Sequence, residues 1–132
     1  MSDAFPGEPA EFGKHIGMEL VDWTPGAARI ELALTAIHAN RQGLPHGGIH
    51  AALLDSAMGY AGCHADEGGM NALTLSLNVQ YLSRPEGSRL IATARRTGGG
   101  RSTYFAEGEV TDETGRVIAT GTGVFRYRKP AT

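Results

Sequence analysis

Apolar and polar residues alternate along much of this 132-residue chain, a pattern typical of strands with one buried face. The segment 28–34 shows it clearly, with Ile30, Leu32 and Leu34 at every second position. We also expect strands over residues 16–23, 88–97, 102–111 and 116–127. Residues 35–45 carry no periodic pattern and are expected to form a loop.

The longest alternating segment covers residues 73–81. Because successive side chains of a strand point to opposite faces, we expect its apolar residues to share one face. These residues are Leu73, Leu75, Leu77, Val79 and Tyr81. The polar residues are expected on the other face: Thr74, Ser76, Asn78 and Gln80.

Turns that contain glycine or proline separate the predicted strands. They are TPGA at 24–27, SRPEGS at 83–88, GGGR at 98–101 and DETG at 112–115. Gly115 stands where a tight hairpin needs a positive φ angle. Because short turns join antiparallel neighbours, we expect consecutive strands in the second half of the chain to pair with each other.

Residues 47–64 form a segment whose pattern predicts a long helix. One stripe, with spacings of three and four, is expected to face the sheet: Ile49, Ala52, Leu53, Ser56, Ala57, Tyr60 and His64. The opposite side carries further residues that are small or apolar: Ala51, Leu54, Met58, Gly62 and Cys63. One antiparallel sheet packed on one helix makes an α+β fold, which we expect to span residues 1–132 as a single domain.

The predicted helix has no solvated side, since Asp55 is the only acidic residue between positions 47 and 64. A single sheet covers one side of a helix, so the other side needs a second cover. We expect a second copy of the chain to supply it across a twofold axis. In the alternative, the segments 1–15 and 35–45 cover this side within a monomer.

Composition and charge narrow the classes of function. The net charge is −2 at pH 7, so the chain lacks the basic surface that nucleic-acid binding requires. No stretch approaches the ~18 apolar residues of a membrane span, and residues 1–12 lack the basic and apolar regions of a signal peptide. We therefore expect the chain to bind no membrane. Cys63 is its single cysteine, which suits a reducing compartment, so we expect the chain to be cytoplasmic.

Gly47 and Gly48 open the predicted helix although glycine is a poor helix former. Backbone N–H groups of a first helical turn lack intrahelical partners, so two residues without Cβ atoms can admit a ligand oxygen there. In the alternative, the glycines only let the preceding loop turn tightly into the helix. Asp55 lies eight residues after Gly47, ~12 Å along a helix, and cannot reach a carbonyl bound at its own helix start. The same carboxylate of a partner can, which indicates two composite sites.

The pattern N-x5-HGG-x6-D, formed by Asn40, His46, Gly47, Gly48 and Asp55, resembles the hotdog-fold acyl-CoA thioesterases of the phenylacetyl-CoA thioesterase (PaaI) type. The likeness extends over nearly the whole chain, through IGMELVDWTPGAARIEL, LTLSLNVQYLSRP and GRVIATGTGVFRY. The resemblance implies an antiparallel sheet wrapped around one long central helix, and hydrolysis of acyl-CoA thioesters without a cofactor. It also implies a homodimer that pairs into a dimer of dimers.

The resemblance implies catalytic roles for four residues. The Gly47 N–H would polarise the thioester carbonyl, and Asp55 of the facing subunit would act as general base or as nucleophile. Asn40 would hydrogen-bond the water or the thioester group. Thr74 stands where relatives can carry a Ser or Thr hydroxyl that orients the attack.

Five further residues are implied in substrate binding: His46, Gly48, His50, Arg84 and Arg101. His46 is expected to fix the loop before the helix. His50 departs from the small or apolar residue that relatives often have, and is expected to line the acyl pocket or the dimer interface. Arg84 and Arg101, together with Arg96, are expected to pair with the phosphates of coenzyme A.

Other functions fit these residues less well. His46 and His50 have the i, i+4 spacing of a metal-binding pair, but His46 precedes the helix and no acid follows at a ligand spacing, so we expect no metal. The TGGGRS segment at 97–102 joins two strands and precedes no helix, which excludes a P-loop. A hotdog hydratase or dehydratase typically pairs a histidine with an acid, and the HGG-to-Asp pattern fits hydrolysis better. A non-catalytic acyl-CoA-binding module predicts a missing carboxylate, whereas Asp55 is present.

Overall fold

The computed structural model describes residues 9–68 and 70–128. Its helices are α1 (Glu11–Ile16), η1 (Ala36–His38), α2 (Gly47–Gly62) and η2 (Ala65–Glu67). Its strands are β1 (Glu19–Thr24), β2 (Ala27–Ala33), β3 (Asn71–Tyr81), β4 (Arg89–Gly99), β5 (Thr103–Asp112) and β6 (Val117–Arg128). The predicted strands and the long helix are present, but α1 was not predicted and includes Ile16, where the first strand was expected to begin.

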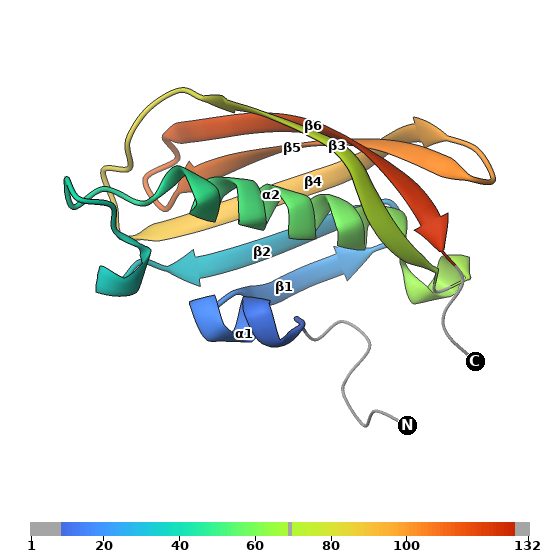
Figure 1. The fold of residues 1–132 in the computed structure, drawn as a ribbon, viewed down its shortest axis with the longest axis horizontal. Helices are drawn as coiled ribbons and strands as arrows, with labels where there is room; N and C mark the ends of the chain where they lie inside the picture. Colours follow the sequence, from blue (N-terminus) through green and yellow to red (C-terminus); the bar gives the residue numbers. More distant parts are fainter. Residues whose placement is uncertain (1–8, 69, 129–132) are drawn as a thin grey trace.

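The strands form one six-stranded antiparallel sheet in the order β1-β2-β4-β5-β6-β3, with β1 and β3 at its edges. The sheet curves around α2, which lies across one face of it (Figure 1). Apolar side chains from the sheet fill the space beneath the helix: Ile30, Leu32, Leu90, Val110, Ile118 and Phe125. The α+β architecture expected from the sequence is therefore confirmed. No described helix is long and apolar enough to cross a membrane.

The expected pairing of consecutive strands is correct for β4 with β5 and for β5 with β6, but wrong for β3 with β4. β3 pairs with β6 at one edge of the sheet. The chain then crosses the end of the sheet and enters β4, which lies near the middle of the sheet (Figure 1). The seven residues between Tyr81 and Arg89 are enough to span two intervening strands, so a short connection does not make these strands neighbours.

Two carboxylates from the β5–β6 turn hold this crossing connection. Asp112 accepts hydrogen bonds from the N–H groups of residues 86 and 87 at 2.8 and 3.0 Å. Glu113 accepts from those of residues 88 and 89 at 2.9 and 3.0 Å. Asp112 is only 1% exposed and also accepts from the backbone and hydroxyl of Thr114. The N–H groups of four consecutive residues, three in the connection and the first of β4, are thus satisfied by side chains about 25 residues away.

The face of α2 that packs on the sheet differs from the expected stripe. Its buried residues are His50, Leu53, Leu54, Ala57, Met58, Ala61 and Gly62. Leu54 and Met58, which the sequence placed on the opposite side, are fully buried, whereas Ile49 and Ser56 are only partly buried. Because both sides of this helix are apolar, its periodicity does not mark which side faces the sheet.

Aromatic side chains satisfy the carbonyl groups in the last turns of α2. Tyr104 donates to Met58 at 3.0 Å, Trp23 to Tyr60 at 2.8 Å, and Tyr127 to Gly62 at 3.0 Å. The last four carbonyls of a helix lack i+4 partners, and the donors to Tyr60 and Gly62, with the Tyr104 hydroxyl 3.3 Å from the Gly59 carbonyl oxygen, stabilise this end of α2. Gly62 is required here, because a Cβ atom at this position would lie 2.1 Å from the Tyr104 ring.

Candidate active site

Asp55 and Thr74 form a hydrogen-bonded pair on the side of α2 that the sheet leaves partly open. Asp55 lies in the middle of α2 and is partly buried, and Thr74 lies near the start of β3. The Thr74 hydroxyl donates to Asp55 Oδ1 at 2.7 Å. The structure therefore brings together two of the four residues predicted to be catalytic, within one chain.

Thr74 reaches Asp55 because β3 contains a β-bulge. Two consecutive residues of β6 pair with Thr74 and Ser76, which leaves Leu75 without a partner. A bulge inserts one residue and so reverses the alternation of the side chains that follow it. The expectation that the apolar residues of 73–81 share one face is therefore wrong: Leu73 and Leu75 are 46% and 49% exposed. Without the bulge, the pattern expected from the sequence would turn Thr74 away from the helix.

His46 caps the start of α2 with its side chain. Its Nδ1 atom accepts a hydrogen bond from the N–H of Gly48 at 2.9 Å. A Cβ atom on Gly48 would lie only 3.0 Å from this nitrogen, so glycine gives the imidazole the room to bind there. The Gly48 N–H is thus satisfied by His46, whereas the Gly47 N–H has no acceptor among the described residues. Gly47 is left as the backbone donor that a ligand can use.

Gly47 is packed against a residue that the sequence did not assign to the site. The hydroxyl of Tyr81, at the end of β3, donates to the Gly47 carbonyl at 2.7 Å. A Cβ atom on Gly47 would lie 3.3 Å from that hydroxyl oxygen. Neither Gly47 nor Gly48 has a positive φ angle, so both glycines serve close approach rather than an unusual backbone conformation. No pattern in the sequence distinguishes Tyr81 from the other residues of its strand.

His50 lies beneath the first turn of α2 and is only 5% exposed. Its ring packs edge-on against Tyr81, with 5.4 Å between the ring centroids, and its Nδ1 atom lies 3.3 Å from the His46 carbonyl oxygen. Burial lowers the pKa of His50, although the carbonyls of His46 and Gly47 oppose this shift. The structure therefore places His50 inside the chain, against the peptide groups that precede and follow Gly47.

Asn40 is oriented by the loop that leads to α2. Its Oδ1 atom accepts hydrogen bonds from the N–H groups of Gln42 and Leu44 at 2.9 and 3.1 Å. With the oxygen engaged, the side chain presents its NH2 group, which only donates. Asn40 and His46 line the same open hollow of about 610 Å³. The structure therefore brings Asn40 to the end of α2 at which Gly47 lies.

The residues that can donate to a substrate carbonyl lie at the start of α2, whereas the acid lies in its middle. Asn40, His46 and Gly47 lie at its start, while Asp55 follows Gly47 by eight residues, or ~12 Å of helix. Asp55 and Thr74 instead line a separate cavity of about 660 Å³ between α1, α2 and the start of β3. The chain thus contains two half-sites rather than one complete site.

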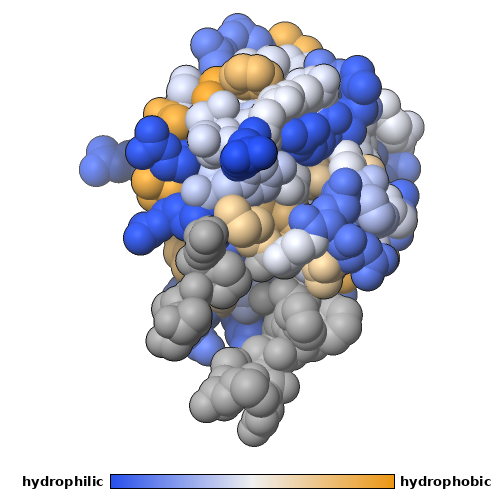
Figure 2. Space-filling model, turned by 90° about the vertical axis from the view of Figure 1, so that its right-hand side faces the viewer, coloured by the Kyte–Doolittle hydropathy of each residue, from blue (hydrophilic) through white to orange (hydrophobic). Residues whose placement is uncertain are grey.

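The predicted arginines are also distributed over the two ends of the sheet. Arg84 follows β3 at the end where α2 begins, and Arg101 lies in the β4–β5 turn at the end where α2 finishes (Figure 1). At the latter end, hydrophilic and apolar side chains are interspersed on the surface (Figure 2). Arg96 is engaged within the chain, since its Nε donates to the Tyr127 hydroxyl at 3.1 Å. Arg84 and Arg101 therefore do not meet within one chain.

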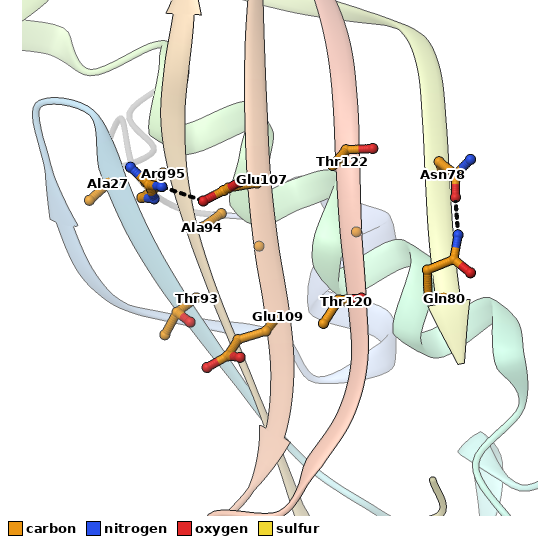
Figure 3. A pocket seen from close by; sticks show the side chains of 12 residues that line it. Ala27, Asn78, Gln80, Thr93, Ala94, Arg95, Glu107, Glu109, Thr120 and Thr122 are labelled. Carbon is orange, nitrogen blue, oxygen red and sulfur yellow. Dashed lines mark hydrogen bonds and ion pairs between the residues drawn. The ribbon is translucent and has the colours of Figure 1, made fainter. Parts of the chain in front are cut away.

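A third hollow, of about 810 Å³, lies on the face of the sheet away from α2. Most of the residues that line it have polar side chains, among them Asn78, Gln80, Glu109 and an ion pair between Arg95 and Glu107 (Figure 3). None of the residues predicted for catalysis or substrate binding lines it. Among the residues that the structure describes, no group of three or more His, Cys, Asp or Glu side chains is placed to hold a metal ion.

Comparison with known proteins identifies the family. The family model described as "Thioesterase superfamily" matches residues 42–119, which contain α2 and most of the sheet. The chain belongs to the thioesterase superfamily. As a member, it is a thioester hydrolase, and its sheet curved around one long helix is the hotdog fold that the sequence resemblance implied.

Relatives and a solved structure agree with this assignment. The thioesterase is 31% identical over 104 residues to acyl-coenzyme A thioesterase 13 of Mus musculus, covering 77% of this chain and 74% of the relative. It is 28% identical over 103 residues to 1,4-dihydroxy-2-naphthoyl-CoA hydrolase of Listeria monocytogenes, covering 78% and 84%. A mutant of the phenylacetic acid degradation protein PaaI from Thermus thermophilus superposes with a TM-score of 0.79 at 29% identity, covering 89% and 98%. The PaaI-type resemblance is therefore confirmed.

Proposed function

We propose that this thioesterase hydrolyses acyl-CoA thioesters to the free acid and coenzyme A. The observation that carries the proposal is the Asp55–Thr74 pair, held at 2.7 Å on the partly open side of α2. A carboxylate oriented by a hydroxyl, together with a free backbone donor at Gly47, supplies the base and the oxyanion donor that thioester hydrolysis needs. The names of the mouse and Listeria relatives, both of which act on coenzyme A esters, support the same substrate class.

Each active site is built from two subunits in this proposal. In a dimer with antiparallel α2 helices, the partner subunit's Asp55 lies opposite the Gly47 end of the first subunit. Two features support such a contact: the side of α2 around Asp55 is only partly covered, and β3 is an edge strand with Leu73 and Leu75 exposed. An edge strand with exposed apolar residues is a surface that a second chain can cover.

The reaction begins with the thioester carbonyl at the start of α2. The Gly47 N–H and the Asn40 NH2 group donate hydrogen bonds to its oxygen, which makes the carbonyl carbon more electrophilic. Water attacks this carbon while Asp55 accepts the proton, and the negative charge moves to the oxygen held by Gly47. Collapse of this intermediate breaks the C–S bond, and the leaving thiolate takes the proton from Asp55. In the alternative, Asp55 attacks the carbonyl itself and water hydrolyses the resulting anhydride.

Thr74 acts on Asp55 and not on the substrate in this scheme. Its hydroxyl donates to one carboxylate oxygen and leaves the other free for water or the carbonyl carbon. Arg84 of one subunit and Arg101 of its partner lie at corresponding ends of an antiparallel dimer. They are therefore placed to bind the phosphates of one coenzyme A together.

Replacing Asp55 by asparagine tests the proposal. We expect kcat/KM to fall by about 10²–10⁴, because asparagine keeps the shape but neither accepts a proton nor attacks the carbonyl. Hydrolysis of an acyl-CoA panel is followed by detection of the free thiol, with thermal unfolding as a check on folding. Asp22→Asn, at an exposed position of β1, is the matched control and should retain full activity. A D55N enzyme as active as the wild type, or a wild type that cleaves no acyl-CoA, would contradict the proposal.

A further inference from the structure

His50 is the one polar side chain among the buried residues of α2. It is 5% exposed, and the other buried residues of the helix are apolar or glycine: Leu53, Leu54, Ala57, Met58, Ala61 and Gly62. A leucine would fill such a position without the cost of burying a polar ring, and it favours a helix more than histidine does. Packing alone therefore does not explain a histidine at this position.

The polar contact of the His50 ring is with the backbone at the start of its own helix. Its Nδ1 atom lies 3.3 Å from the His46 carbonyl oxygen, at the long end of hydrogen-bond distances. Burial lowers the pKa of His50 below its ordinary value, so the ring is neutral at pH 7 and carries a single proton. Because a carbonyl oxygen only accepts, this contact places the proton on Nδ1, and the ring donates to the His46 carbonyl.

The His46 carbonyl belongs to the same peptide group as the Gly47 N–H. This N–H has no acceptor among the described residues, whereas that of Gly48 is bonded to the His46 side chain. In a trans peptide the C=O and N–H groups point in opposite directions, so His50 binds the group from within the chain without occupying its N–H. A donor on a peptide carbonyl also strengthens the N–H of the same group as a donor, because the two are conjugated.

The ring of His50 is itself held in place by Tyr81. The two rings pack edge-on, with 5.4 Å between their centroids and 79° between their planes. The Tyr81 hydroxyl donates to the Gly47 carbonyl at 2.7 Å, so the peptide groups on both sides of Gly47 are bonded from within the chain. A donor fixed in this way needs no rearrangement when charge develops on the atom that it binds, which is the condition for oxyanion stabilisation.

We propose that His50 is a positioning residue, whose Nδ1–H holds and polarises the peptide group that presents the Gly47 N–H to the substrate. The inference rests on the proposed function, in which this N–H binds the thioester carbonyl oxygen. His50 does not touch the substrate in this role. It strengthens the bond to the oxygen most when negative charge develops there, so it raises kcat and leaves the affinity for the uncharged thioester almost unchanged.

Two substitutions at position 50 separate this role from packing. His50→Leu keeps the core filled and removes the donor, whereas His50→Asn leaves a gap but keeps an N–H donor at the position of Nδ1. With the acyl-CoA that the wild type cleaves best, we expect kcat to fall at least about threefold in His50→Leu and less than about twofold in His50→Asn, with KM nearly unchanged in both. The melting temperatures should follow the opposite order, because leucine packs better than asparagine. A kcat that follows the melting temperature would overturn the proposal.

A second measurement does not depend on catalysis. His46–Gly47 is the only His-Gly pair in the chain, so labelling histidine carbonyls with ¹³C and glycine with ¹⁵N gives one signal in a two-dimensional HNCO spectrum. Loss of a hydrogen bond from a carbonyl moves its ¹³C resonance, and the ¹⁵N resonance of the same peptide group, upfield. We expect both resonances to move upfield in His50→Leu and to stay close to the wild-type values in His50→Asn. Equal shifts in the two variants would show that His50 does not donate to this peptide group.

The two proposals fail in different ways. An enzyme that hydrolyses acyl-CoA, but has the same kcat in His50→Leu and His50→Asn and an unmoved His46–Gly47 signal, keeps its proposed function and loses the role of His50. A protein that cleaves no acyl-CoA, while this signal moves in His50→Leu alone, loses its proposed function and keeps His50 as the residue that holds the Gly47 peptide group.

Discussion

The peptide group between His46 and Gly47 is held by donors from its own chain. Its carbonyl accepts a hydrogen bond from Ile49 N–H at 2.9 Å and faces the Nδ1 atom of the buried His50. On the far side of Gly47, the next carbonyl accepts from the Tyr81 hydroxyl. Hydrogen bonds to a peptide carbonyl polarise the group and strengthen its N–H as a donor. The contacts at the His46 carbonyl therefore act on the peptide group that carries the Gly47 N–H, whereas the Tyr81 hydroxyl fixes the position of Gly47 from its other side.

Removing the Tyr81 hydroxyl should weaken catalysis without removing a group that touches substrate. In Tyr81→Phe we expect kcat to fall by about two- to tenfold, the worth of one hydrogen bond, with KM nearly unchanged. Steady-state kinetics with one acyl-CoA measure both constants. Tyr127→Phe is the matched control, because it removes a hydroxyl bonded to the Gly62 carbonyl at the other end of α2. Its kcat should equal that of the wild type, and an equal loss in both variants would reduce Tyr81 to a structural role.

At the scale of the elements, the β5–β6 turn fixes where the chain enters β4. The hydrogen bonds from the Thr114 hydroxyl, and then from the N–H groups of residues 86 and 87, hold the pKa of Asp112 far below its usual range. The N–H of Ser88 is the main cause that lowers the pKa of Glu113. Both carboxylates therefore bind the crossing connection in their charged form.

These shifts predict an acid-sensitive fold. A carboxylate whose pKa is lower in the folded state stabilises the fold at pH values above its unfolded pKa, about 3.9 for Asp, and loses this contribution as the pH falls further. We expect the melting temperature of the wild type to fall steeply below about pH 4.5. Asp112→Asn should be less stable at pH 7 and should show a shallower acid limb in thermal unfolding between pH 3 and 8. Asp22→Asn should follow the wild-type curve, and parallel acid limbs for D112N and wild type would rule out this role.

The sequence predicted the elements better than their arrangement. Alternation and turn residues located the strands from 88 onward, because each hairpin pairs residues that are close in the chain. The position of β3 at the edge was not predictable, because the carboxylates that hold its connection lie about 25 residues away. The bulge at Leu75 was missed for a related reason: the alternation from 73 to 81 continues without a break in the sequence.

The candidate site was predicted in part. The structure pairs Asp55 with Thr74, a contact that the sequence analysis did not predict. The side chain of His46 was expected to fix the loop before the helix, and in the structure it caps the first turn of α2 by accepting from the Gly48 N–H. Tyr81 was missed because its hydroxyl reaches a residue 34 positions earlier in the chain, a contact that no local pattern indicates. The catalytic and binding roles themselves stay predictions.

At the scale of the whole molecule, the composite sites predict that two inactive variants of the chain restore activity when they form mixed dimers. Asp55→Asn keeps an intact Asn40, and Asn40→Ala keeps an intact Asp55, so a heterodimer of the two contains one site with both residues. When the two variants are co-expressed in equal amounts, half of the dimers are mixed, and we expect about a quarter of wild-type activity. Each variant alone should be nearly inactive.

Activity of the mixture is compared with the sum of the two variants measured separately at the same total concentration. Thiol release from an acyl-CoA is the readout, and sedimentation of the mixture confirms that dimers form. An activity no higher than that sum would show that each site uses Asn40 and Asp55 from one chain, and would exclude the composite site.

The absence of a cation among the described residues that line the cavity beside Asp55 also bears on how a turnover ends. The acyl group enters as part of a neutral thioester, but it leaves as a carboxylate that forms beside Asp55. Two like charges in a mainly apolar space repel each other strongly, because little water is present to screen them. Hydrolysis thus converts a neutral acyl group into a carboxylate that Asp55 repels. We therefore expect the released fatty or aromatic acid to be a poor inhibitor of the enzyme that makes it.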